Sequence, residues 1–78
     1  MFYTYVLKSL VDKKLYTGST NDLKRKIKEH NSGSEKSTKN RKPFKLVYYE
    51  ACLSLEKSRK REQYFKTGFG RRFLKTRI

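Results

Sequence analysis

Apolar residues gather in two short stretches near the start of the chain, FYTYVLKS and KKLYTG, with a polar turn around Asp12 between them. Their aromatic and β-branched residues are typical of β-strands. The two stretches therefore predict a β-hairpin. Side chains alternate along a strand, so a connecting loop with an even number of residues places Tyr3, Tyr5 and Tyr16 on one face, whereas an odd loop separates Tyr5 from Tyr16.

A helical period follows in STNDLKRKIKEH. Leu23, Ile27 and His30 fall at positions i, i+4 and i+7, which share one face of a helix. Ser19 and Asp22 have the S-x-x-D spacing of a capping box. The stretch predicts a first helix whose apolar stripe ends at His30.

The second half of the chain predicts one strand and two helices. The segment from Asn31 to Pro43 has no apolar residue and predicts a mobile basic loop. FKLVYYEAC is almost continuously apolar and aromatic, as in a strand covered on both faces. Ser54 is placed to cap a second helix, LEKSRKREQYFKTG, which Gly68 ends, and RRFLKTRI predicts a short last helix. The predicted fold is α+β, a small three-stranded antiparallel sheet flanked by helices in the order ββαβαα.

The length of 78 residues predicts a single domain over 1–78, because a chain this short has too little apolar surface for two cores. No apolar stretch approaches the ~20 residues that span a bilayer, and the first residues lack the features of a secretory signal. The one cysteine, Cys52, lies at a predicted strand end. We expect it to be a structural thiol in the reducing cytoplasm.

Charge indicates the partner. The chain has 21 Lys plus Arg against 7 Asp plus Glu, a formal net charge of +14. Such a field attracts polyanions by steering and by release of counterions, so nucleic acid is the expected partner. A membrane surface is a less suitable partner for this charge. The basic residues are interspersed with Tyr and Phe along the chain and do not form one amphipathic run. A basic structural protein of the ribosome is one alternative to an enzyme.

One acid stands out in the second predicted helix. Leu55, Glu62 and Phe65 share a face by helical spacing, so Glu62 points toward the sheet. It could instead form an ordinary surface pair with Lys66, one turn later. A buried carboxylate needs a cation or a donor beside it, and a divalent metal would be such a partner. The other six acids are scattered along the chain and predict no second carboxylate site.

These residues, in this order, resemble the GIY-YIG endonuclease family. Tyr3-Thr4-Tyr5 resembles its first motif and Tyr16-Thr17-Gly18 its second, with the usual ten residues between the two motif tyrosines. His30 follows a basic residue of the first helix by four positions, and Glu62 falls where the family keeps its metal-binding glutamate. The resemblance covers nearly the whole chain and is strongest to the small stand-alone bacterial branch.

The resemblance implies metal-dependent hydrolysis of DNA with little sequence specificity, in repair or processing. Tyr5 would act as general base or orient the attacking water, with its phenol pKa lowered by Tyr16 and the basic helix. Glu62 alone would hold one Mg²⁺ or Mn²⁺. His30 would form hydrogen bonds within the site or to the phosphate. The products would be 5′-phosphate and 3′-hydroxyl ends.

A cation of the first helix would bind the non-bridging phosphate oxygens. The family has arginine at that position, whereas this chain has Lys26, with Arg25 beside it. Further basic residues are expected to contact the nucleic-acid backbone, whether DNA or RNA: Lys24, Lys28, Lys36, Lys39, Arg41, Lys42 and Arg59.

Each of these residues also has a structural interpretation. The tyrosines could be cross-strand aromatic pairs, His30 could favour a helix C-terminus, and Lys26 could lie on a solvated face. A non-catalytic nucleic-acid-binding module with a degenerate site is therefore the alternative function. It predicts salt-sensitive binding without cleavage.

Overall fold

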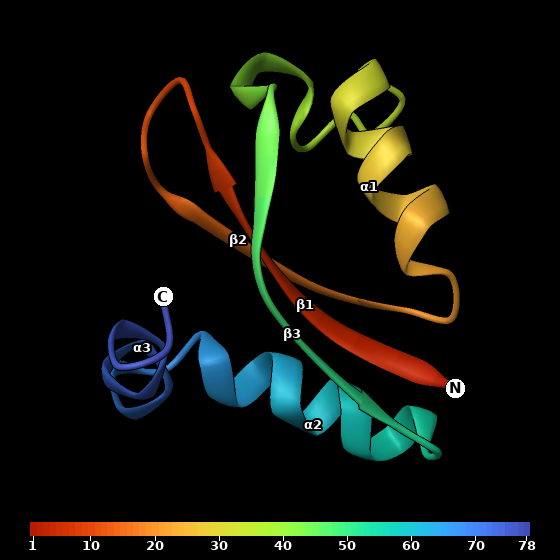
Figure 1. The fold of residues 1–78 in the computed structure, drawn as a ribbon, viewed down its shortest axis with the longest axis vertical. Coiled ribbons are helices and arrows are strands. Elements are labelled where there is room, and N and C mark those ends of the chain that lie inside the picture. Colours follow the sequence, from red (N-terminus) through yellow and green to blue (C-terminus); the bar gives the residue numbers. More distant parts are fainter.

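A sheet of three antiparallel strands, in the order β2-β1-β3, carries helices on both of its faces (Figure 1). The computed structural model describes all residues 1–78. It confirms the predicted α+β fold and the order ββαβαα. The elements are β1 (Phe2–Ser9), β2 (Leu15–Thr20), α1 (Leu23–Ser32), a 3₁₀ turn η1 (Lys39–Arg41), β3 (Phe44–Cys52), α2 (Leu55–Phe65) and α3 (Gly68–Lys75).

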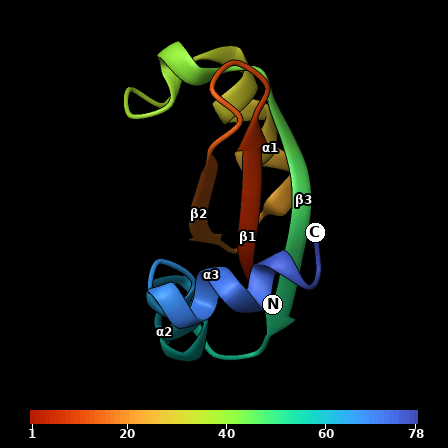
Figure 2. The same cartoon turned by 90° about the vertical axis from the view of Figure 1, so that its left-hand side faces the viewer.

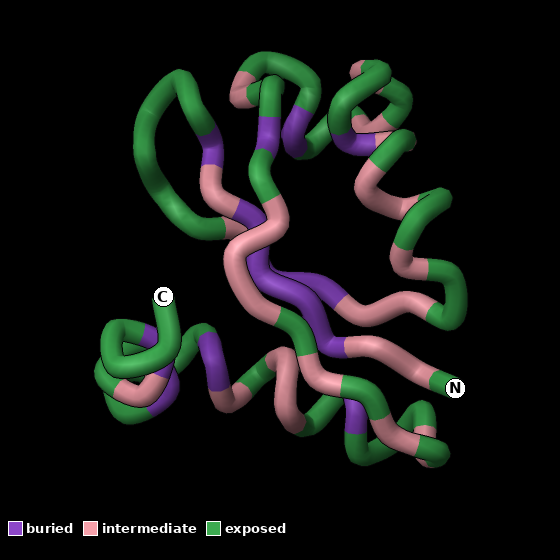
Figure 3. The backbone as a smooth tube through the Cα atoms, in the orientation of Figure 1, coloured by how far each residue is buried: buried purple, intermediate pink, exposed green.

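Successive residues of β1 enter two different cores. Tyr5 and Leu7 pack with Phe44 against α1, whereas Val6 packs with Phe65 and the α3 residue Leu74. The buried part of the chain therefore follows β1 through the middle of the molecule (Figure 3). Figure 2 shows α1 and the α2–α3 pair at different ends and faces of the sheet. None of the helices has the length and apolar character needed to cross a bilayer.

The register of the hairpin fulfils the even-loop condition. Leu7 is opposite Tyr16, Tyr5 is opposite Gly18 and Tyr3 is opposite Thr20. Opposite residues of an antiparallel pair share a face, so the three tyrosines lie on the α1 face of the sheet.

The prediction that the third strand is covered on both faces is wrong. β3 is an edge strand, paired only with β1, and its Tyr49 is 52% exposed. The central strand is β1, whose residues Thr4 to Leu7 are all buried. Cys52 is half-buried at the end of β3, and its thiol donates to the Ser54 carbonyl oxygen at 3.2 Å.

Two helix boundaries differ from the prediction. Asp22, not Ser19, is the N-cap of α1, where its side chain accepts from the Arg25 N–H. At the other end of the chain, Gly68 does not end α2. Thr67 caps a new helix there, and α3 begins at Gly68.

The segment between α1 and β3, predicted to be a mobile loop, is held by polar contacts. The Asn31 side chain forms two hydrogen bonds with the backbone of Phe44. Arg41 forms an ion pair with Asp12 in the hairpin turn, with Nε 2.8 Å from Oδ2. Thr38 is fully buried. Polar side chains thus take the place of the missing apolar ones.

Candidate active site

Three polar side chains form a buried chain of hydrogen bonds under α1. The Tyr5 hydroxyl lies 3.0 Å from Nε2 of His30, and Nδ1 of His30 lies 2.8 Å from Oγ1 of Thr38. All three residues are at most 1% exposed. Burial lowers the pKa of His30, which favours the neutral imidazole. A neutral ring has one donor and one acceptor nitrogen, so it satisfies both hydroxyls.

Gly18 covers the Tyr5 ring from β2. A Cβ atom at Gly18 would lie 2.6 Å from Cζ of Tyr5, so this close approach requires glycine. Burial then raises the pKa of Tyr5, and the nearby Tyr16 and Glu62 raise it further. The prediction of a lowered phenol pKa is therefore wrong. The basic helix does not have the expected effect, and carboxylates neutralise one of its cations.

That cation is Lys26. Its Nζ donates to Oε1 of Glu35 at 2.7 Å and lies 4.0 Å from Oε1 of Glu29. The hydrogen bond with Glu35 raises the pKa of Lys26 and lowers that of Glu35. Arg25 extends the cluster, with Nε 3.9 Å from Oε2 of Glu29. The turn after α1 returns Glu35 to the helix beside Glu29, although the two acids belong to no group of three or more possible metal ligands.

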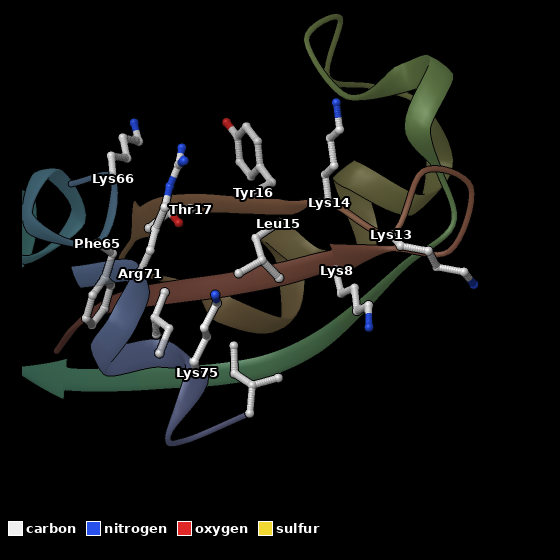
Figure 4. A pocket seen from close by; sticks show the side chains of 12 residues that line it. Lys8, Lys13, Lys14, Leu15, Tyr16, Thr17, Phe65, Lys66, Arg71 and Lys75 are labelled. Carbon is white, nitrogen blue, oxygen red and sulfur yellow. The ribbon is translucent and has the colours of Figure 1, made fainter. Parts of the chain in front are cut away.

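Tyr16 lies on the exposed side of the buried chain. Its ring contacts the edge of His30, with 5.0 Å between centroids. The residue is half-buried, and its hydroxyl is directed away from the ribbon of β2 (Figure 4). Tyr16 is therefore the member of the tyrosine–histidine group best placed to contact a substrate.

Glu62 approaches β2 from the opposite face of the sheet. Ser19 donates from Oγ to Oε1 of Glu62 at 2.5 Å, and Lys66 donates from Nζ to Oε2 at 3.0 Å. The side chain of Glu62 is 23% exposed. Both interpretations of the sequence are thus realised, since the carboxylate points toward the sheet and also forms the helical pair.

The donor set around Glu62 fits a single hydrated Mg²⁺ or Mn²⁺. The structure has no group of three or more His, Cys, Asp or Glu residues that could enclose a metal ion. Mg²⁺ commonly keeps several waters and binds one or two carboxylates. An ionised carboxylate has about four lone-pair sites, and Ser19 and Lys66 occupy two of those on Glu62.

Two pairs of the candidate residues influence each other electrostatically. The Lys26 charge lowers the pKa of His30, and the Glu62 charge raises that of Tyr5. Strand β2 links the two sides, because Tyr16 and Ser19 project from its opposite faces.

The predicted backbone-binding residues differ in availability. Arg41 is half-buried, paired with Asp12 and 5.6 Å from the Phe44 ring centroid, so its charge is already compensated. The others are exposed and form no ion pair: Lys24, Lys28, Lys36, Lys39, Lys42 and Arg59.

Sequence reasoning missed three supporting residues. Ser19 resembled a helix cap, which concealed its bond to Glu62. Thr38 and Glu35 lie in a segment without apolar residues, where no period indicates burial or direction. The Asn31 contacts with Phe44 are the local feature that returns this segment to the sheet.

The chain matches the family described as GIY-YIG catalytic domain over residues 1–75. The chain belongs to the GIY-YIG family. A UPF0213 protein of Clostridium perfringens is 46% identical over 67 residues, covering 85% of this chain and 71% of the relative. One of Streptococcus pyogenes serotype M3 is 48% identical over 65 residues, covering 82% and 70%.

A solved structure agrees with these matches. The solution NMR structure of a UPF0213 protein from Bacillus halodurans has a TM-score of 0.59 and 36% sequence identity, and covers 97% of this chain and 84% of that one. GIY-YIG domains are generally nucleases that depend on divalent metals and act on nucleic acids.

Proposed function

We propose that this GIY-YIG domain hydrolyses phosphodiester bonds of DNA, with little sequence specificity, using one Mg²⁺ or Mn²⁺ held by Glu62. The observation that carries the proposal is the position of Glu62. A helix that is otherwise rich in Lys and Arg directs this carboxylate at β2, where Ser19 fixes it beside the strand that carries Tyr16.

The tyrosines have different roles in this proposal. Tyr16 orients the attacking water through its outward-directed hydroxyl. Tyr5 is buried and has a raised pKa, so it stays protonated at neutral pH and acts as a positioning residue. It holds the neutral His30 ring, which in turn contacts the ring of Tyr16.

The remaining residues bind charge. Lys26, with Arg25 beside it, binds the non-bridging phosphate oxygens, for which Lys26 must share its ammonium with Glu35. A bound divalent ion would stabilise the negative charge that develops on the phosphate and the leaving 3′ oxygen. Exposed lysines of α1 and the following segment contact the DNA backbone, which carries no base information directly. The products are 5′-phosphate and 3′-hydroxyl ends.

A binding module without catalysis is the second candidate, and the Lys26–Glu35 contact favours it. A lysine offers a point charge where arginine offers a fork that can bind two oxygens at once. With its ammonium 2.7 Å from a carboxylate, Lys26 has less capacity left for a phosphate than a free arginine.

Cleavage assays distinguish the two candidates. Purified protein is incubated with flapped, branched, single-stranded and duplex DNA, in Mg²⁺, Mn²⁺ or EDTA. We expect metal-dependent cleavage, and a fall of about 100-fold or more in Glu62→Gln with DNA affinity unchanged or slightly raised. Glu56→Gln is the matched control, because Glu56 lies on the same helix and is 79% exposed. Binding of every substrate without cleavage by the wild type would favour the binding module.

A further inference from the structure

A groove of about 800 Å³ lies between the β1–β2 hairpin and α3 (Figure 4). Lys8, Lys13 and Lys14 border it on the hairpin side, and Arg71 and Lys75 project into it from α3. Apolar residues form much of the remaining lining: Leu15, Tyr16, Phe65, Leu74 and Ile78. No acidic residue lines the groove.

The positive charge of this groove is uncompensated. All seven acids of the chain already have partners, six in ion pairs and Asp22 as the cap of α1. Of the six groove cations only Lys66 has a carboxylate partner, Glu62. Five cations on two facing walls, with no counter-charge, form a site for a polyanion.

The groove adjoins the candidate active site. Tyr16 lines it and also packs on His30. Lys66 lines it and also donates to Glu62. A strand that lies in the groove therefore continues directly to the residues proposed to carry out hydrolysis.

The combination of cations and apolar floor fits an unpaired strand better than a duplex. Leu15 is 40% exposed and Ile78 50% exposed, so the floor has apolar surface to bury. Bases of a single strand can cover such surface while phosphates face the lysines, whereas a duplex keeps its bases stacked inside.

We infer that this groove binds a few nucleotides of single-stranded DNA and leads that strand to the active site. The inference rests on the proposed nuclease function and makes it more specific. The preferred substrate is DNA with an unpaired strand next to the cleaved bond, such as a flap or a single-stranded tail.

A pair of charge-matched double variants tests the groove. Lys14→Gln/Lys75→Gln removes one cation from each wall, and neither side chain forms an ion pair or hydrogen bond. Lys57→Gln/Lys60→Gln removes two cations from α2. Lys57 borders a separate hollow near Thr4, and Lys60 forms only an exposed pair with Glu56.

Fluorescence anisotropy in EDTA measures the affinity for a labelled oligothymidine and for a duplex of equal length, across a salt series. We expect the groove variant to bind oligothymidine about 10-fold more weakly, with the salt slope reduced by about 1.4, since each single-strand contact contributes about 0.7. Affinity for the duplex, and both affinities of the α2 variant, should change less than about 3-fold. Arg71→Gln should also weaken the binding of oligothymidine, but by a smaller factor than the double variant.

Equal weakening by the two double variants, or equal loss for duplex and oligothymidine, would overturn the inference. Cleavage assays of the wild type and Glu62→Gln test the proposed function separately from this binding test. If the wild type never cleaves but the groove variant loses oligothymidine binding, the inferred binding site is supported and the proposed nuclease function is contradicted. If the wild type cleaves and the groove variant binds oligothymidine normally, only the inferred binding site is contradicted.

Discussion

Two regions of the molecule hold cations in different states, the surroundings of α1 and the groove beside α3. On the α1 face, Lys26 lies 2.7 Å from Glu35, and Arg41 is paired with Asp12. Lys14, Arg71 and Lys75 line one groove beside α3, without an acid beside them. Lysine is therefore neutralised at position 26 and available at positions 14 and 75.

This difference teaches that net charge does not locate the binding surface. The sequence analysis assigned most of the phosphate contacts to the first helix and the following segment. The structure neutralises some of the cations there, since Glu29, Glu35 and Asp12 all form ion pairs on that side. The groove cations come from the hairpin turn and the last helix, which are far apart in the sequence.

The largest effect is expected where the α1 face is packed most tightly. Gly18→Ala places a methyl group against the buried Tyr5 ring, which its hydrogen bond to His30 holds in place. We expect a loss of about 1–3 kcal/mol in the free energy of unfolding, measured by urea denaturation. Gly68→Ala, on the other face, meets no atom within 4 Å and should be neutral or slightly stabilising. Equal stability of the two variants would contradict the packing of Tyr5 under Gly18.

A smaller effect concerns pH. Burial lowers the pKa of His30 below its ordinary value, so below about pH 6.5 the unfolded chain takes up a proton that the folded protein resists. His30 therefore costs stability as pH falls, at up to about 1.4 kcal/mol per pH unit.

Urea denaturation between about pH 7 and pH 5.5 measures this slope. His30→Gln should be less stable than the wild type at neutral pH, because it disturbs the bonds to Tyr5 and Thr38. Its stability should depend less on pH over the same range. The carboxylates with lowered pKa, such as Glu35, lose their contribution only at lower pH. An unchanged slope in the variant would show that His30 is not the buried titrating group.

The smallest effect is expected at the compensated cation. Lys26→Arg keeps the charge and offers a fork that can contact Glu35 and a phosphate together. We expect cleavage of a flapped substrate to be retained or raised by about 3-fold, which is less than 1 kcal/mol. Lys26→Gln, the matched neutral variant, should be slower than the wild type. Loss of cleavage in Lys26→Arg would show that the lysine is required for its shape.

Local patterns predicted most of the fold, and their failures have physical causes. The aromatic stretches around Tyr5 and Tyr16 predicted the hairpin correctly, but left open whether the two tyrosines share a face. The apolar run FKLVYYEAC led to the wrong prediction of a strand covered on both faces. An edge strand of a small sheet can carry tyrosines that stay half-exposed. The sequence predicted a lowered pKa for Tyr5 because of nearby cations. Burial of Tyr5 under Gly18 raises this pKa instead.

The site was predictable as a set of residues but not as a geometry. Glu62 could be assigned to the sheet side of its helix from spacing, and the structure agrees. Its partner Ser19 could not be found, because a serine before a helix is also typical of a cap. Long-range polar contacts such as Lys26–Glu35 leave no period in the sequence, so only the folded chain shows them.

The central claim is that Glu62, and not the carboxylates around Lys26, holds the divalent ion. Titration of ¹⁵N-labelled protein with Mn²⁺ tests it directly, because the paramagnetic ion broadens the amide signals nearest to it. The account predicts selective broadening at Ser19 and Glu62 that disappears in Glu62→Gln and persists in Glu56→Gln. Broadening centred on Glu29 and Glu35, and unchanged in Glu62→Gln, would contradict it.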